Sequence, residues 1–225
     1  MKVACVIPAY NEEPNIGHVV KGAKKYCDLV IVVDDGSTDR TSLEAKREGA
    51  IVIRHQRNLG KGAALRTGFK SAIEHGADVI VVIDGDGQHD PNEIPKLVQA
   101  LLNRDADIVI GSRFLKRQLS GMPPQRILSN FLTTTILKLL FGIKITDSQC
   151  GFRAFKRTAL EKLIDFEDNK YAAETEILIN AKRYGFKIIE VGISVKYGEE
   201  ESKIRPIRDT VRWIRLVFKK FFEKQ

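Results

Sequence analysis

A run of apolar residues ends in a short acidic segment whose composition is that of a metal site. Residues 79–83 are all valine or isoleucine, and they are followed by Asp84, Asp86 and Gln88 with a glycine after each of the two aspartates. A β-branched run of this kind is typical of a strand buried on both faces of a parallel sheet. If the extended conformation persists, the three polar side chains point the same way.

Three oxygen donors at the end of a strand suit a hard cation. Mg²⁺ or Mn²⁺ prefers such ligands, and a metal held by one or two carboxylates typically completes its shell with substrate phosphates. The alternative is an acidic turn before a helix that starts at Pro91. We favour the metal site, because two glycines and a buried strand are more than a turn requires.

A second acidic pair, Asp34 and Asp35, follows an earlier apolar run. Carboxylates only accept hydrogen bonds, so Asp35 is matched to the donors of a base or ribose and not to phosphate. The glycine patterns of dehydrogenases and P-loop NTPases are absent, since Gly60-Lys61-Gly62 continues to Leu65 and no GxxxxGK[ST] occurs. Those two enzyme classes are therefore disfavoured.

Alternating apolar and helical patterns predict an α/β fold with a mostly parallel sheet. Strands are expected at 3–7, 29–33, 50–54, 78–83 and 108–110, with helices between them. After a polar loop at 116–126 we expect a helix at 127–141, a strand at 147–155, a helix at 175–184, an edge strand at 187–195 and a helix from Pro206. Ligands of such sheets lie beyond the carboxyl ends of the strands, where the polar clusters fall.

The 225 residues, 43% of them hydrophobic, fit one domain. We divide it into 1–115, 116–205 and a basic tail at 206–225. Three unpaired cysteines, no leader peptide and no 18-residue apolar run predict a cytoplasmic protein that does not cross a membrane by itself.

Six motifs, in this order along the chain, resemble those of the dolichyl-phosphate mannose synthase family of inverting GT-A glycosyltransferases. They are Pro8-Ala9-Tyr10-Asn11-Glu12, Val33-Asp34-Asp35-Gly36-Ser37-Thr38-Asp39, Asn58-Leu59-Gly60-Lys61-Gly62, Asp84-Gly85-Asp86-Gly87-Gln88, Gly111-Ser112-Arg113 and Gly151-Phe152-Arg153. The resemblance implies transfer of a hexose from a nucleotide sugar of the GDP-mannose or UDP-glucose type to a polyprenyl phosphate, with Mg²⁺ or Mn²⁺.

The same resemblance implies a set of site residues. Nucleotide binding is expected at Pro8, Ala9, Tyr10, Glu12, Asp35, Lys61 and Asp84, and metal binding at Asp84, Asp86 and Gln88. Its implied partners are the nucleotide sugar, the lipid phosphate and a membrane surface, with a membrane protein as a further candidate and without nucleic acid.

Transfer to a phosphate calls for cations more than for a general base. A phosphomonoester with a second pKa near ~6 is already largely dianionic at neutral pH. Candidate catalytic cations are Arg113, Arg126, Arg153 and Lys203. Alternatively, Arg113 could pair with a structural carboxylate, and Arg126 could merely flank a helix. Whether Glu174 or Glu176 acts as a general base stays open.

The segment Lys196–Lys203 departs from the family, because Lys196 stands where members often carry arginine and three glutamates are inserted. We expect Tyr197–Arg205 to form a lid that excludes water from the reaction.

The tail is a basic amphipathic helix. Residues 203–225 hold eight Lys or Arg and two acidic residues, which is +6 of the net charge of +8. One face is expected to carry Ile207, Val211, Ile214, Val217, Phe218, Phe221 and Phe222. Such a helix lies on an anionic membrane, and 127–141 is a second candidate, which predicts a peripheral protein at the cytoplasmic membrane face. The alternative is that both helices pack on the sheet.

Two rival functions remain at the level of sequence. A sugar nucleotidyltransferase would share the sheet and the metal, but it usually has a glycine-rich loop after the first strand. A non-enzymatic basic module that binds membrane or nucleic acid would explain the tail. It leaves the acidic strand ends unexplained, because carboxylates repel phosphate unless a metal intervenes.

Overall fold

A seven-stranded sheet forms the centre of the computed structural model, which describes residues 1–116, 121–197 and 206–223. The strand order is β3-β2-β1-β4-β6-β5-β7. The strands are β1 (Val3–Ala9), β2 (Leu29–Asp34), β3 (Ile51–Arg54), β4 (Val79–Val82), β5 (Ile108–Ser112), β6 (Arg153–Lys156) and β7 (Ile188–Gly192).

The sheet is mostly parallel, as predicted. β1 pairs in parallel with β2 and β4, β2 with β3, and β5 with β7, whereas β6 runs antiparallel between β4 and β5. Every residue of β1 and β4 is buried, which explains why these strands read as unbroken apolar runs. The predicted strand at 147–155 was too long, because the chain becomes extended only at Arg153.

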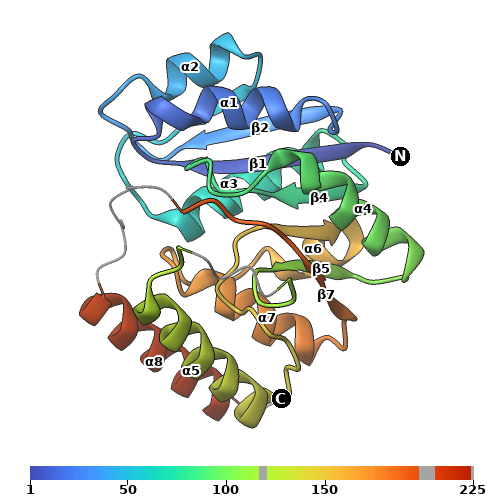
Figure 1. Cartoon of the computed structure of the whole chain (residues 1–225), viewed down its shortest axis with the longest axis vertical. Helices are drawn as coiled ribbons and strands as arrows, with labels where there is room; N and C mark the ends of the chain where they lie inside the picture. Colours follow the sequence, from blue (N-terminus) through green and yellow to red (C-terminus); the bar gives the residue numbers. More distant parts are fainter. Residues whose placement is uncertain (117–120, 198–205, 224–225) are drawn as a thin grey trace.

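Helices cover both faces of the sheet. They are α1 (Glu13–Ala23), α2 (Thr41–Arg47), α3 (Lys61–Glu74), the 3₁₀ turn η1 (Pro91–Glu93), α4 (Ile94–Asn103), α5 (Pro124–Phe141), α6 (Arg157–Leu163), α7 (Ala173–Arg183) and α8 (Pro206–Phe222). α1 and α2 lie on one side of β1 and β2, and α3 lies on the other (Figure 1). The short helix α6 was not predicted from the sequence.

This winding places a change of direction in the strand order between β1 and β4. The chain proceeds from β1 outward to β2 and β3, and then returns through α3 to β4 on the other side of β1. The carboxyl ends of β1 and β4 therefore form a topological switch point, which is where ligands of open α/β sheets bind.

Two long helices lie together apart from the sheet. α5 and α8 run side by side next to α7 (Figure 1), and the rings of Phe141 and Phe221 meet edge to face with centroids 6.2 Å apart. Within the described residues, no helix has the length and apolar content needed to span a bilayer.

Candidate active site

The acidic segment after β4 forms a turn at the switch point. The extended conformation expected for residues 84–88 does not persist, because Gly87 adopts a left-handed φ of 74° and the Gln88 amide donates back to Asp86 Oδ1 at 3.0 Å. Gly85 lies against β1, where a Cβ atom would be 3.3 Å from that of Ala9. The turn thus brings the two aspartates beside the end of β1.

The two aspartates form a centre of excess negative charge. Burial, the charge of Asp84 and that of Glu12 raise the pKa of Asp86 to about 7. Burial alone would raise the pKa of Asp84 as well, but the Lys61 ammonium lowers it. Closely spaced carboxylates whose ionisation is opposed by one another fit a divalent cation, which would remove that repulsion.

Protein ligands alone would leave such a cation incompletely coordinated. Among the residues that the structure describes, no three His, Cys, Asp or Glu side chains gather as a metal-binding group. Two carboxylates and the Gln88 amide match instead the incomplete set that Mg²⁺ or Mn²⁺ completes with water and substrate phosphate. The assignment of Asp84, Asp86 and Gln88 stays a prediction consistent with this geometry.

Lys61 joins this turn to helix α7. Its Nζ lies 2.7 Å from Asp84 Oδ1 and 2.9 Å from Glu174 Oε1. Gly151 lies against this trio, since a Cβ there would meet side-chain atoms of all three residues. A buried ammonium at the edge of the aspartate pair is placed to meet a diphosphate. Glu174 faces the site, whereas Glu176 points away from it toward α8.

Asp35, predicted to bind the nucleoside, holds the turn before α3. Its carboxylate accepts hydrogen bonds from the amides of Leu59 and Gly60 at 2.9 and 2.7 Å, and it contacts His55 Nδ1 at 2.7 Å. Asp35 therefore fixes the turn before α3. Its direct contact with a base or ribose stays a prediction.

The other predicted nucleotide residues line the end of β1. Pro8 and Ala9 belong to the strand and are buried, while Tyr10 and Glu12 follow it and are partly exposed. The Glu12 amide donates to Thr41 Oγ1 at 2.8 Å, so this loop is tied to the one after β2. The fold thus brings Pro8, Ala9, Tyr10, Glu12, Asp35, Lys61 and Asp84 to one edge of the sheet, as predicted, and their contacts with a nucleotide stay a prediction.

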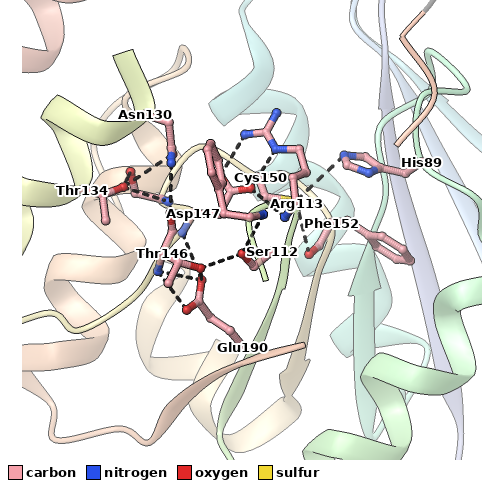
Figure 2. Close-up of polar contacts among 12 residues, drawn as sticks. His89, Ser112, Arg113, Asn130, Thr134, Thr146, Asp147, Cys150, Phe152 and Glu190 are labelled. Atoms are coloured by element: carbon pink, nitrogen blue, oxygen red, sulfur yellow. Dashed lines mark hydrogen bonds and ion pairs between the residues drawn. The ribbon is translucent and has the colours of Figure 1, made fainter. Parts of the chain in front are cut away.

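Arg113 at the end of β5 forms a two-pronged pair with Asp147. Arg113 Nε and Nη2 lie 2.7 and 2.8 Å from the two carboxylate oxygens, and the Asp147 side chain is fully buried. Figure 2 shows these side chains with Ser112, Thr146 and Glu190, which hold the segment before β6. The structural alternative for Arg113 is thus realised. Sequence reasoning missed Asp147, whose only signal was its place in the polar residues that open the predicted strand at 147–155.

Arg113→Lys is expected to lower both stability and activity although the charge is kept. A lysine ammonium cannot reproduce the two parallel hydrogen bonds to buried Asp147, so the free energy of unfolding should fall by about 1–3 kcal/mol. The rate of the sugar transfer that the resemblance implies should fall at least tenfold, with nucleotide binding preserved. Denaturant unfolding and initial rates test this against exposed Arg104→Lys; equal behaviour of the two variants would refute it.

Arg126 lies in the first turn of α5. Burial raises the pKa of Tyr197, while the positive charges of Arg113 and Arg126 act to lower it. Burial lowers the pKa of the neighbouring His89 to about 4, which leaves its ring neutral at pH 7. Arg113, Arg126 and Tyr197 together form a cationic and hydrogen-bonding region beside the aspartate turn.

Arg153 has a different task from the one predicted. It is 2% exposed, and its guanidinium donates to the carbonyl oxygens of Cys150, Glu174 and Ser148 at 2.8, 2.9 and 3.0 Å. These bonds leave Arg153 inside the fold, where it positions Glu174, so a direct contact with substrate is not supported. Lys203 and most of the expected lid at 197–205 lie outside the described residues.

The neighbouring helices α5 and α8 both carry exposed apolar side chains. Its exposed side chains are Leu128, Phe131, Leu132, Leu139 and Leu140 on α5, and Val211, Ile214, Phe218, Phe221 and Phe222 on α8. We call these ten residues the outer face. The basic residues Arg208, Arg215 and Lys219 are exposed beside it on α8. Val217 was assigned to this face wrongly, because its side chain is buried.

Comparisons with known proteins show the family to which this chain is related. Residues 4–164 match the family model described as glycosyl transferase family 2. The UDP-N-acetylglucosamine–dolichyl-phosphate N-acetylglucosaminyltransferase of Methanococcus voltae is 38% identical over 214 residues, which cover 86% of this chain and 85% of that protein. The polyprenol monophosphomannose synthase of Mycolicibacterium smegmatis is 32% identical over 200 residues, covering 84% and 75%.

A solved structure shares the fold over the whole chain. Glucosyl-3-phosphoglycerate synthase from Mycobacterium tuberculosis, in complex with Mn²⁺, uridine diphosphate and phosphoglyceric acid, superposes with a TM-score of 0.76 at 25% sequence identity. The match covers 100% of this chain and 80% of that chain. The fold expected from the sequence, GT-A with a mostly parallel sheet, is confirmed.

Proposed function

Since the chain belongs to glycosyl transferase family 2, we propose that it moves a sugar from a nucleotide diphosphate sugar to the phosphate of a polyprenyl lipid, with inversion at the anomeric carbon. The observation that carries the proposal is the arrangement of three neighbouring regions. An aspartate turn with Lys61 suits a diphosphate, the Arg113 and Arg126 region suits a second phosphate, and the outer face suits a lipid.

The names of the relatives support the same acceptor. One is named for transfer to dolichyl phosphate, and the other for making a polyprenol monophosphomannose. Their sugars differ, so the relatives support the class of donor and not the mannose or glucose expected from the sequence. One relative is named for transfer from UDP-N-acetylglucosamine, and the solved structure of similar fold contains uridine diphosphate, which makes UDP-N-acetylglucosamine the first donor to test.

The chemistry requires that two anions approach each other in line. An oxygen of the acceptor phosphate forms a bond to the anomeric carbon while the bond from that carbon to the diphosphate breaks. The acceptor is already dianionic, so no proton has to be removed from it. Arg113 stays paired with Asp147 and, together with Arg126, supplies positive charge that attracts the acceptor phosphate. Lys61 offsets charge on the departing diphosphate.

The residues around the aspartate turn fit a divalent metal. Asp84, Asp86 and Gln88 would hold Mg²⁺ or Mn²⁺, which supplies electrostatic stabilisation of the departing diphosphate when bound. Mn²⁺ and uridine diphosphate are present in the solved structure of similar fold. Glu174 orients Lys61 at this place through their 2.9 Å contact and does not have to act as a base.

The outer face is the surface by which we expect the protein to meet the membrane, at its cytoplasmic side. A polyprenyl chain stays in the bilayer, so the site must approach the headgroup region. The exposed phenylalanines and leucines can enter the boundary of the acyl chains, and the adjacent cations are attracted to anionic lipid. α5 joins this surface to the acceptor region, since Arg126 lies in its first turn.

Product formation tests the proposal directly. The purified chain should convert a short polyprenyl phosphate in detergent to a lipid-linked sugar with one of UDP-N-acetylglucosamine, UDP-glucose or GDP-mannose in the presence of Mn²⁺. Excess EDTA should stop the reaction, and the corresponding polyprenol without phosphate should give no product. Failure with all three donors, or equal turnover of the free alcohol, would overturn the proposal.

A further inference from the structure

Helix α8 is joined to the protein body by a buried ion pair. Lys220 Nζ lies 3.1 Å from Glu176 Oε1 on α7, and the two side chains are 8% and 0% exposed. Its neighbour Lys219 has half of its side chain exposed and pairs with the exposed Glu167. An ion pair inside a protein differs from one at the surface, because loss of one partner leaves a charge without compensation in a medium of low polarity.

Glu176 also holds the chain that precedes α7. Its Oε2 accepts hydrogen bonds from the amides of Glu167 and Asp168 at 3.0 and 2.9 Å. The Asp168 carboxylate in turn accepts a 2.6 Å hydrogen bond from Arg212 of α8. Glu176 of α7 therefore holds the backbone at 167–168, and Arg212 of α8 holds the Asp168 side chain.

That backbone packs directly on the glycine turn at the start of α3. The Asn169 carbonyl accepts from the Ala63 amide at 3.3 Å, and Lys170 Nζ donates to Asn58 Oδ1 at 3.1 Å. A Cβ atom on Gly62 would collide with the carbonyl oxygen of Asp168. Because the backbone at 168–169 touches the backbone at the start of α3, a shift of one segment displaces the other.

Lys61 lies within this turn, between Gly60 and Gly62, and its ammonium reaches Asp84. We propose that Lys220 and Glu176 are positioning residues for the donor site: the pair fixes residues 166–170, and these fix the turn that aims Lys61 at the diphosphate. This inference rests on the proposed function only in taking Lys61 and Asp84 as the place of a nucleotide diphosphate. It gives α8 a task in donor binding.

Nucleotide binding by the full chain, without lipid, tests the proposal. Uridine and guanosine diphosphate are titrated with Mn²⁺ by calorimetry, below the melting temperature of each variant. Lys220→Met should weaken the affinity at least fivefold, whereas Lys219→Met, which removes the same charge one position earlier, should stay within twofold of the wild type. The double variant Glu176→Gln/Lys220→Met should return to within threefold, because an amide oxygen still accepts from residues 167 and 168 and no buried charge is left unpaired.

A second pair of variants covers the case in which Lys220→Met does not fold. Arg212→Met releases Asp168 and should weaken nucleotide binding, whereas exposed Arg215→Met should not. A purely structural role would lower the melting temperature and leave the affinity of the folded protein unchanged, which would overturn the inference. Equal affinities of Lys220→Met and Lys219→Met would do the same, whereas a wild type that binds neither nucleotide would contradict the proposed function as well.

Discussion

Asp86→Asn is expected to reduce sugar transfer by at least a thousandfold while the protein stays folded. An amide is a much poorer ligand for a hard cation than a carboxylate, and the remaining carboxylate, Asp84, already has Lys61 at 2.7 Å from one oxygen. The Asn side chain keeps an oxygen that can accept the 3.0 Å hydrogen bond from the Gln88 amide, so the turn should persist. Initial rates at saturating donor and Mn²⁺, together with Mn²⁺ binding, measure the effect.

Asp90→Asn is the matched control. Asp90 lies four residues further along and accepts from the Asn92 amide at 2.9 Å, so it caps η1. Asparagine is as good at this position as aspartate, and the same charge is removed nearby. This variant should keep wild-type activity. Full activity of Asp86→Asn, or of the wild type in excess EDTA, would be incompatible with a metal at the turn.

Asp86→Asn should also change the free energy of unfolding in a way that depends on pH. The pKa of Asp86 is raised to about 7 by burial, Asp84 and Glu12, whereas an unfolded aspartate titrates near ~3.9. The folded state therefore holds this proton more tightly, and without metal its stability falls as the pH rises from about 4 to about 7. In EDTA above pH 7, Asp86→Asn should be more stable than the wild type by up to ~4 kcal/mol, with the difference vanishing near pH 4. A difference that does not change with pH would exclude this origin.

The parallel half of the fold was predictable because its signal is local. In β1, β2 and β4, burial on both faces demands an apolar residue at nearly every position, and the run stops where the chain reaches the edge of the sheet. Polar residues just after such runs, such as Asp35 and Asp84, are thereby placed at the carboxyl ends before any contact is known. The switch point between β1 and β4 follows from the same pattern.

The acceptor half depends on contacts that no local pattern contains. β6 is inserted antiparallel between β4 and β5, and the sequence of Arg153–Lys156 does not specify those neighbours. Arg113 finds its carboxylate 34 residues later at Asp147, which is itself fixed by Glu190 of β7. The motif around Arg113 marked an important position, but whether its guanidinium faced a phosphate or a buried aspartate depended on the pairing of distant strands.

The tail helix shows a similar division. The spacing of its apolar residues predicts an amphipathic helix, but it does not say which side of the helix packs on the protein and which side is exposed. Trp213 turns inward and donates to Thr175 Oγ1 at 2.9 Å, and Lys220 is buried beside Glu176 because a long apolar stem carries its charge to that partner. One side of α8 thus packs on α7 and not on the sheet, while the outer face remains exposed. Removal of the helix would disturb both sides, so single-face substitutions are the cleaner test.

Replacement of three exposed residues of the outer face should release the protein from membranes without changing its fold. Phe131→Ser/Phe218→Ser/Phe222→Ser removes large side chains that the structure leaves exposed on α5 and α8. Insertion of each ring into the headgroup boundary contributes on the order of 1.5 kcal/mol, so the triple variant should bind anionic liposomes roughly a thousandfold more weakly. Liposome sedimentation measures this, and nucleotide binding reports on the rest of the site.

A triple variant elsewhere distinguishes a surface with a function from ordinary exposed apolar residues. Leu43, Leu102 and Tyr184 are also exposed, but they lie outside the outer face. Leu43→Ser/Leu102→Ser/Tyr184→Ser should therefore sediment with liposomes like the wild type, and it should use a lipid acceptor in vesicles equally well. The outer-face variant should lose turnover in vesicles and keep it with a short acceptor in detergent, because only the first reaction requires the bilayer. Equal sedimentation of both triple variants would show that the protein does not dock through α5 and α8.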